Sequence, residues 1–156
     1  MKKIRPCLWL DHNVKEAIDF YTSVFKNSRV LSTSYYPDDA PDFGGEILVA
    51  DLVIEDQEFM LLNGGPIFKF NESVSFSIEA NTQEEIDYYW KNLIDGGGEE
   101  SQCGWLKDKF GLSWQVSPAM LGQLLQDEDA GKAQRVMQAM MQMRKIIIKD
   151  LEDAAE

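Results

Sequence analysis

The sequence predicts an α+β fold made of two copies of one strand-helix-strand-strand-strand unit, followed by C-terminal helices. Segments with the two-residue alternation of strands and segments with helical spacing follow one another in the same order in both halves. In addition, Ile18-Asp19-Phe20-Tyr21 is echoed by Ile86-Asp87-Tyr88-Tyr89, an offset of 86 − 18 = 68 residues, which also pairs residues 6–10 with residues 74–78. We expect the two units to form a cupped sheet around a shared hollow.

Length and composition predict one domain, residues 1–156, with a first module at 1–66, a second at 67–118 and a helical tail at 119–156. A formal charge of −12 disfavours nucleic acids and anionic membranes as partners. No apolar run approaches the roughly 20 residues that span a bilayer, and the start of the chain enters a strand pattern without a signal-peptide core. We therefore expect a cytoplasmic protein.

The first module begins with a strand over residues 4–10. Asn13 and Glu16 then match a capping box at the start of a helix. The helix has an apolar stripe at helical spacing, formed by Val14, Ala17, Ile18, Tyr21 and Phe25. Residues 29–36 alternate as a strand, 37–45 form a loop, and 46–55 with 57–62 predict a hairpin about the Glu55-Asp56 turn.

In the second module the same offset pairs Asn13 with Asn81 and Glu16 with Glu84, and glycines 96–98 end the helix. A short strand leads to a hairpin over residues 104–118 that contains a D-x-F-G turn. On its second strand one face is apolar, with Leu112, Trp114 and Val116, and the other is polar, with Ser113, Gln115 and Ser117. Such a polar row orients a small molecule if the sheet is concave there, and is merely solvated if it faces outward.

The residue pattern of the tail predicts two helices. Ser117 is the expected cap and Pro118 the first residue of a short helix that ends at residue 126. Asp127 and Asp129 start a longer helix that runs through the methionine-rich segment. Its apolar stripe, which we expect to dock on the domain or on a second copy, comprises Met137, Met140, Met141, Arg144, Ile148 and Leu151.

Several motifs give the chain a family resemblance. They are Pro6-x-Leu8-Trp9-Leu10, Phe20-Tyr21-x-x-Val24-Phe25, Gly64-Gly65-Pro66 with Phe70-Asn71, Ser75-Phe76, Asp87-x-x-Trp90, the segment from 104 to 118, and Arg135-Val-Met-Gln-Ala-Met. With the duplicated unit, the chain resembles the vicinal oxygen chelate superfamily, which includes glyoxalases, extradiol dioxygenases and bleomycin-resistance proteins. More narrowly it resembles the PhnB-like branch, whose domain is labelled 3-demethylubiquinone-9 3-methyltransferase. The resemblance implies a glyoxalase-like fold.

The resemblance also implies where a metal would bind. Members of the superfamily commonly hold a divalent metal through His, Glu or Gln on the first and last strands of each half. Those places here are residues 5–7, 61–63, 73–75 and Gln115, and only Gln115 is a plausible ligand, whereas a catalytic site needs about three. The single histidine, His12, precedes the helix and is expected to be solvated or capping. We predict that the metal site is lost and that no cofactor is bound.

The methyltransferase label implies S-adenosylmethionine, which many enzymes hold with a glycine-rich turn after a parallel strand. No G-x-G-x-x-G follows a strand in this sequence, because glycines 96–98 follow a helix and Gly64-Gly65 precede a proline. The label therefore carries little weight, although fold alone does not decide function.

Three functions remain open. The first is a metal-free homodimer that binds an apolar or aromatic small molecule, gripped by Trp9, Phe70 and Trp105 and oriented by Ser75, Asp108 and Gln115. The second is an enzyme on a small aromatic or quinone-like substrate, the methyltransferase of the label included, with Asp108 or Glu46 as general base. The third is a structural or partner-binding homodimer that uses its methionine-rich tail. Trp105 could instead simply pack, and Asp108 could simply cap its turn.

Overall fold

The computed structural model describes residues 3–156, and the chain divides into two compact units. Unit 1 comprises residues 1–70 and unit 2 comprises residues 71–156. The grouping of the whole chain into one domain, with module boundaries at 66 and 118, stays a prediction.

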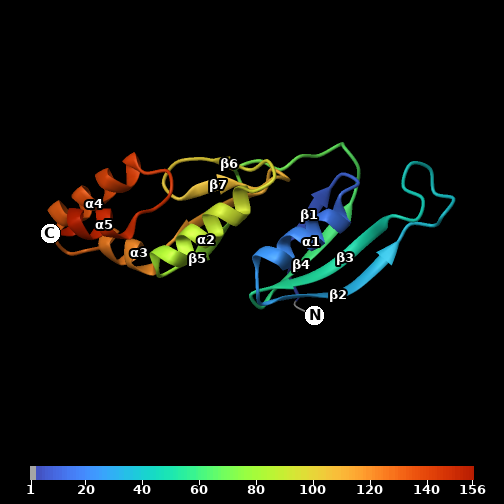
Figure 1. Cartoon of the computed structure of the whole chain (residues 1–156), viewed down its shortest axis with the longest axis horizontal. Coiled ribbons are helices and arrows are strands. Elements are labelled where there is room, and N and C mark those ends of the chain that lie inside the picture. Colours follow the sequence, from blue (N-terminus) through green and yellow to red (C-terminus); the bar gives the residue numbers. More distant parts are fainter. Residues whose placement is uncertain (1–2) are drawn as a thin grey trace. The chain divides into compact units, whose positions relative to one another are not determined.

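Unit 1 is one strand-helix-strand-strand-strand module (Figure 1). Its elements are β1 (Cys7–Leu10), α1 (Val14–Val24), β2 (Ser28–Tyr35), β3 (Ile47–Ile54) and β4 (Gln57–Asn63). The sheet has the strand order β1-β4-β3-β2, in which β1 and β4 run parallel and the other neighbours antiparallel. The predicted hairpin is confirmed, because Glu55 and Asp56 join β3 to β4 with φ of 44° and 63°, as a two-residue turn between twisted strands requires.

The core of unit 1 lies between α1 and one face of this sheet. All five residues of the predicted helix stripe are buried, and they pack with alternate strand residues such as Leu8, Leu52 and Leu61. Because strand side chains alternate, Cys7 and Trp9 point to the opposite, open face. The sheet therefore has one buried face and one face that is available to a ligand or to another surface.

Unit 2 repeats the module and adds three helices. Its elements are β5 (Ser75–Glu79), α2 (Gln83–Ile94), β6 (Glu99–Glu100), β7 (Trp105–Lys107), β8 (Ser113–Ser117), α3 (Ala119–Leu125), α4 (Ala130–Gln142) and α5 (Ile148–Ala155). The sheet order β5-β8-β7-β6, with β5 parallel to β8, is that of unit 1. The predicted fold class, two modules with C-terminal helices, is thus confirmed. Within residues 3–156, no helix combines the length and the apolar character that a membrane crossing needs.

The predicted gap-free repeat is wrong in the helices. The helices begin at Val14 and Gln83, an offset of 83 − 14 = 69. The buried positions Ala17, Tyr21 and Val24 of α1 then correspond to Ile86, Trp90 and Leu93 of α2. An extra residue between strand and helix in unit 2 shifts the helix face by one position, so the repeated Ile-Asp-aromatic-Tyr motif is not structurally equivalent.

Three predicted helix caps are also wrong. Asn13 is the N-cap of α1, but its side chain accepts a hydrogen bond from the Asp11 N–H instead of capping the helix. In unit 2 the capping box forms one residue later than predicted, between Thr82 and Glu85. At α3 the N-cap is Pro118 rather than Ser117, and the Ala119 N–H donates to the Asn81 side chain.

The second predicted helix of the tail, the long one that follows the short helix α3, is broken in the structure. Asp129 caps α4 as expected, but the chain becomes extended at Met143 and α5 starts at Ile148. The break turns Met137 and Met141 outward, 47% and 60% exposed, and the buried apolar residues are Val136, Met143, Ile146 and Leu151. The segment after α4 pairs in cis with unit 2, since Met143 O and Arg144 O accept the N–H groups of residues 103 and 104.

Candidate functional site

The open face of the unit 2 sheet carries three of the six predicted site residues, Ser75, Trp105 and Gln115. In the register of β7 and β8, Trp105 lies beside Gln115 and Lys107 lies beside Ser113. Ser113 is in turn paired with Ser75 on β5. Cross-strand partners on one face stand about 5 Å apart, so these side chains form one continuous polar and aromatic surface. The alternation of β8 places Trp114 and Val116 on the buried face, as predicted.

Ser75 and Gln115 are brought together by the parallel pairing of β5 and β8. The Gln115 side-chain amide donates to Ser75 Oγ at 2.9 Å. A primary amide has two N–H donors and one carbonyl acceptor, so this bond fixes the amide while leaving it further hydrogen-bonding capacity. The two residues, 40 positions apart in the sequence, form a pre-oriented polar pair.

Ser113 is a polar residue whose importance the sequence did not reveal. Ser113 is 1% exposed. Among the buried side-chain oxygen and nitrogen atoms of residues 3–156, only the Ser113 Oγ has no hydrogen-bond partner. Burying an unpaired hydroxyl costs on the order of 1–3 kcal/mol. Ser113 lines a cleft of about 120 Å³ together with Trp105, Leu106, Lys107 and Ser101 and with three glutamates, Glu72, Glu99 and Glu100, whereas Ser75 and Gln115 do not line it. The orphaned hydroxyl therefore lies at the wall of a cavity.

Lys107 at this cleft is held by an ion pair with Glu72. The hydrogen bond from Lys107 lowers the pKa of the Glu72 carboxyl, and the same contact raises the pKa of Lys107. Both groups therefore stay charged at neutral pH. The pair gives one side of the cleft a fixed ionic border.

Asp108 is placed in the turn between β7 and β8, where its carboxylate serves the turn itself. It is 2% exposed, and Oδ1 accepts from the N–H groups of Phe110 and Leu112 at 2.9 and 3.1 Å. Oδ2 accepts from Trp114 Nε1 at 2.9 Å. Asp108 thus caps its turn, which is the second of the two roles that the sequence left open for it. Its role in orienting a ligand stays a prediction.

Trp9 and Phe70 belong to unit 1. The Trp9 indole donates from Nε1 to Gly65 O at 2.8 Å and meets Phe68 edge to face, with ring centroids 4.9 Å apart. A Cβ on Gly64 would lie 2.2 Å from the indole, so glycine is needed there for the ring to pack. Phe70 is half-buried. Ligand contact by these two aromatic residues stays a prediction.

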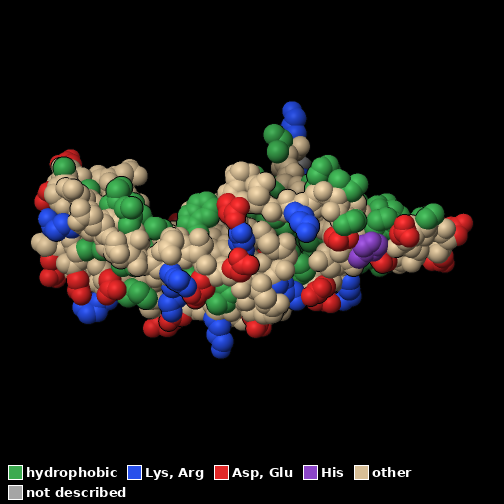
Figure 2. Space-filling model, turned by 90° about the horizontal axis from the view of Figure 1, so that it is seen from above, with side chains coloured by type: hydrophobic (Ala, Val, Ile, Leu, Met, Phe, Trp, Pro, Cys, Tyr) green, Lys and Arg blue, Asp and Glu red, His purple; other side chains and the backbone are tan. Residues whose placement is uncertain are grey.

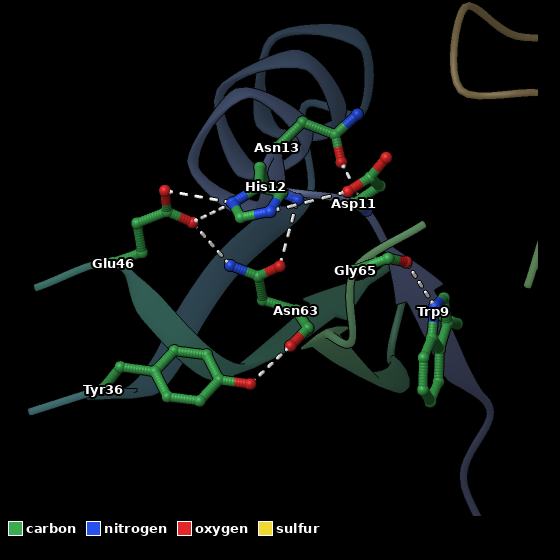
Figure 3. A network of polar contacts seen from close by, with 8 residues as sticks. All are labelled: Trp9, Asp11, His12, Asn13, Tyr36, Glu46, Asn63 and Gly65. Atoms are coloured by element: carbon green, nitrogen blue, oxygen red, sulfur yellow. Dashed lines mark hydrogen bonds and ion pairs between the residues drawn. The ribbon is translucent and has the colours of Figure 1, made fainter. Parts of the chain in front are cut away.

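Unit 1 also contains a polar network that the sequence analysis did not assemble (Figure 3). His12 Nδ1 lies 3.1 and 3.0 Å from the two carboxylate oxygens of Glu46. Asn63, 1% exposed, donates from its amide to Glu46 at 2.8 Å and accepts the His12 backbone N–H at 3.0 Å. No local pattern signals this network, because residues 12, 46 and 63 belong to three separate segments.

Aromatic rings support the same network. His12 stacks on Phe43 with ring centroids 4.6 Å apart and an interplanar angle of 7°. Phe43 in turn stacks on Tyr36 at 4.8 Å, and the Tyr36 hydroxyl donates to the backbone oxygen of Asn63. The stack packs the β2–β3 loop against the end of β4.

The residues present do not fit a metal of the superfamily's type. Among residues 3–156, no three His, Cys, Asp or Glu side chains cluster as ligands would. Cys7 lies where the resemblance places a ligand, but partial burial raises the pKa of its thiol and favours the protonated form, which binds metals poorly. At the matching place in unit 2, Gln115 is hydrogen-bonded to Ser75. We derive no step through a metal.

Comparison with known proteins decides the family. The family model of 3-demethylubiquinone-9 3-methyltransferase matches residues 2–117. The chain belongs to this family. A comparison with curated proteins gave no match.

Solved structures support the assignment of this 3-demethylubiquinone-9 3-methyltransferase family member. The PhnB protein from Bacillus cereus, which carries the same methyltransferase name, is 32% identical, with a TM-score of 0.70 over 76% of this chain and 100% of that chain. A Pseudomonas aeruginosa protein is 21% identical, with a TM-score of 0.61 over 76% of this chain and 98% of that one. The fosfomycin resistance protein FosX from Listeria monocytogenes shares the fold at 15% identity, with a TM-score of 0.56 over 81% and 98% of the two chains. Membership of the glyoxalase-like, vicinal oxygen chelate superfamily is therefore confirmed.

The family description does not bring a methyl-donor site with it. Gly64 and Gly65 follow β4 but lead to a turn at Pro66 and then to irregular backbone, and the glycine run at 96–98 follows α2. Neither has the strand-turn-helix geometry that holds the donor in doubly wound methyltransferases. The residues do not fit that way of binding S-adenosylmethionine, and we derive no methyl transfer.

Proposed function

We propose that this chain binds a small aromatic molecule bearing a hydrogen-bond acceptor, without a metal, on the open face of the unit 2 sheet. The observation that carries the proposal is the buried, unpaired Ser113 hydroxyl at the wall of a cleft. An acceptor atom of a ligand would pair with this hydroxyl and remove the cost of its burial.

The neighbouring residues supply the other two requirements of a small-molecule site. Trp105, half-buried and directly beside Gln115, offers an aromatic surface for a planar ring. The Ser75–Gln115 pair does not line the cleft, but it lies next to Trp105 on the same face and offers further donors in a fixed orientation. An apolar wall with a few convergent polar groups is the usual composition of a ligand pocket.

The size of the cleft limits the ligand. Its volume of about 120 Å³ is below the roughly 300–1,000 Å³ of drug-sized pockets, so it accommodates one ring rather than a large molecule. A quinone ring fits this description, because it is planar and carries two carbonyl acceptors. Duroquinone is a suitable probe because its four methyl groups block addition of protein thiols to the ring. It is larger than the cleft, so one carbonyl edge would enter and the opposite edge would stay outside.

We test the proposal by titrating the ¹⁵N-labelled protein with duroquinone and following the Trp105 indole and Gln115 amide signals. Binding should shift both signals. Gln115→Leu should weaken the affinity about ten-fold, the effect of losing roughly 1.4 kcal/mol of hydrogen bonding. Gln123→Leu, on the exposed surface of α3, is the matched control and should bind like the parent.

Shifts confined to other tryptophans, or an unchanged affinity in Gln115→Leu, would place the ligand elsewhere and contradict the proposed site. Ser113→Ala provides a second check. It removes the unpaired hydroxyl and should stabilise the free protein while weakening duroquinone binding, an opposition that a purely structural residue would not produce.

We also propose that the protein is a homodimer. Support comes from β2, an edge strand of the unit 1 sheet with three large exposed apolar side chains. Val30, Leu31 and Tyr35 are 41%, 48% and 59% exposed. An unpaired strand edge with apolar side chains is a surface that a second chain can cover.

A further inference from the structure

The polar network of unit 1 borders a second pocket, separate from the cleft of the proposed function. This pocket has a volume of about 300 Å³. His12, Glu46 and Asn63 line its polar side, and Val14, Tyr35 and Ile47 line the rest. In the space-filling view, the single histidine of the chain lies at the surface next to acidic side chains (Figure 2).

We propose that His12 and Glu46 form an acid–base dyad that accepts a proton from a small planar molecule in this pocket. Glu46 accepts a hydrogen bond from His12 Nδ1, which places the proton of the neutral ring on Nδ1 and leaves a lone pair on Nε2. Nε2 is therefore the atom that takes up a proton. The carboxylate of Glu46 then stabilises the imidazolium that forms.

Asn63 acts as the positioning residue of the dyad. Its buried side chain holds both members at once, the Glu46 carboxylate through its N–H and the His12 backbone through its carbonyl oxygen. The bond from the Asn63 amide orients the Glu46 carboxylate, and the bond from the His12 backbone N–H holds His12 at its place in the loop, so breaking either one leaves a buried polar atom of Asn63 unpaired.

The backbone of His12 shows that this arrangement is imposed on the residue. His12 has φ of 58°, in the left-handed region that residues other than glycine adopt uncommonly, histidine less rarely than most. Such conformations cost on the order of 1–3 kcal/mol and persist where the surroundings hold them in place. Here the Asn63 bond and the Phe43 stack do so.

The charges around the ring suit a base that becomes a cation. Asp11 Oδ1 lies 3.8 Å from His12 Nε2, and Glu46 lies on the other nitrogen. Lys15, which also lines the pocket, is paired with Asp19. Two carboxylates thus face the imidazole, and the lysine that lines the pocket is paired with a carboxylate of its own.

The first test uses the fact that His12 is the only histidine of the chain. Long-range ¹H–¹⁵N spectra of the neutral ring should show the proton on Nδ1 and a bare Nε2. Glu46→Gln should lower the fraction of this tautomer. A ring with its proton on Nε2 in the parent protein would overturn the proposal.

The second test uses 5-nitrobenzisoxazole, a planar probe that reports on general bases. His12 Nε2 takes the C3 proton, the C–H electron pair completes the nitrile, and the N–O bond breaks to leave a coloured phenolate. We expect the full-length protein to convert the probe at least about ten-fold faster than His12→Asn, a modest share of what general-base catalysis contributes. Asparagine tolerates the left-handed backbone, so this variant should fold.

Glu46→Gln should slow the conversion several-fold, and Glu84→Gln, an exposed glutamate at the start of α2, is the matched control that should leave it unchanged. Equal rates for the parent and a folded His12→Asn protein would overturn the proposal. A purely structural network would change the melting temperature in these variants but would leave the conversion rate at that of the control.

Discussion

At the scale of single residues, Asp108 shows how a predicted ligand group can be used by the fold. Its carboxylate accepts two backbone N–H bonds and the Trp114 indole N–H while 2% exposed. Hydrogen bonds to a charged acceptor are stronger than neutral ones, which is how a buried carboxylate is tolerated here. The same bonds orient Trp114 toward the core of unit 2.

Replacing Asp108 by Asn should therefore destabilise the protein. The amide puts N–H groups where one carboxylate oxygen accepted, so at least one buried donor faces another, at a cost of about 2–3 kcal/mol. Urea unfolding followed by circular dichroism measures this change. Asp95→Asn, at the exposed end of α2, should stay within about 0.5 kcal/mol. If the Asp108→Asn protein were as stable as the parent, the turn would not need the carboxylate, and the ligand-orienting role of Asp108 would gain support.

At the scale of secondary structure elements, α2 provides the docking site of the tail. The Gln83 side chain donates to Ile146 O and accepts the Ile148 N–H, which joins the start of α2 to the start of α5. One turn later, Lys145 forms an ion pair with Asp87 at 2.5 Å. Two polar contacts thus flank Ile146, whose side chain is fully buried.

The Asp87–Lys145 pair should make a small, pH-dependent contribution to stability. The hydrogen bond from Lys145 lowers the pKa of the Asp87 carboxyl below its ordinary value of 3.8. A lowered pKa in the folded state means that the stabilisation is present above about pH 4 and is lost as the pH falls through the folded value. Because the pair is at the surface, we expect 0.2–1 kcal/mol, roughly the range for exposed pairs.

Urea midpoints of the parent and Asp87→Asn, measured from pH 7 down to pH 2, check this prediction. The difference should be constant at neutral pH and should disappear at the acidic end, as the pH falls through the lowered pKa of the Asp87 carboxyl. Asp39→Asn, in the exposed loop of unit 1, should show no such change. A difference that persists at the acidic end would assign the contact to packing instead of charge.

At the scale of the whole molecule, charge and exposed apolar surface bear on assembly. The net charge of −12 keeps copies of the chain apart at long range, so association requires a local apolar contact. The edge strand β2 offers one, and its Leu31 is almost half exposed. Burial of apolar side chains at β2 would have to outweigh the electrostatic repulsion between two negatively charged chains.

We expect sedimentation equilibrium to give twice the 17.8 kDa chain mass at moderate salt. Leu31→Lys should shift the population toward monomer, because a lysine ammonium at an apolar contact must be desolvated. Gln123→Lys, on the exposed surface of α3, makes the same change of net charge away from β2 and should leave the dimer intact. A monomeric parent protein would contradict the homodimer, and a dimer unaffected by Leu31→Lys would place the interface away from β2.

Local patterns in the sequence predicted the duplicated module, the hairpin turn at residues 55–56 and the two faces of β8. These follow from the periods of 2 and 3.6 residues, which each segment carries by itself. The family resemblance could also be recognised from the sequence, because its motifs are short and contiguous. The contact of Ser75 with Gln115 could not be predicted in this way, because it depends on the register of β5 and β8. Ser75 lies beside Ser113 and Gln115 lies beside Ser77, so the hydrogen bond runs diagonally between the two strands.

The tertiary structure alone decided what depends on register and on contacts between distant segments. The one-residue shift between the two helices, the break at Met143 and the cis docking of the tail arise from packing against α2 and β7, which no local period encodes. The His12–Glu46–Asn63 network forms for the same reason. Its three residues meet only because β1 and β4 run parallel and end together, bringing the loop after one strand to the end of the other.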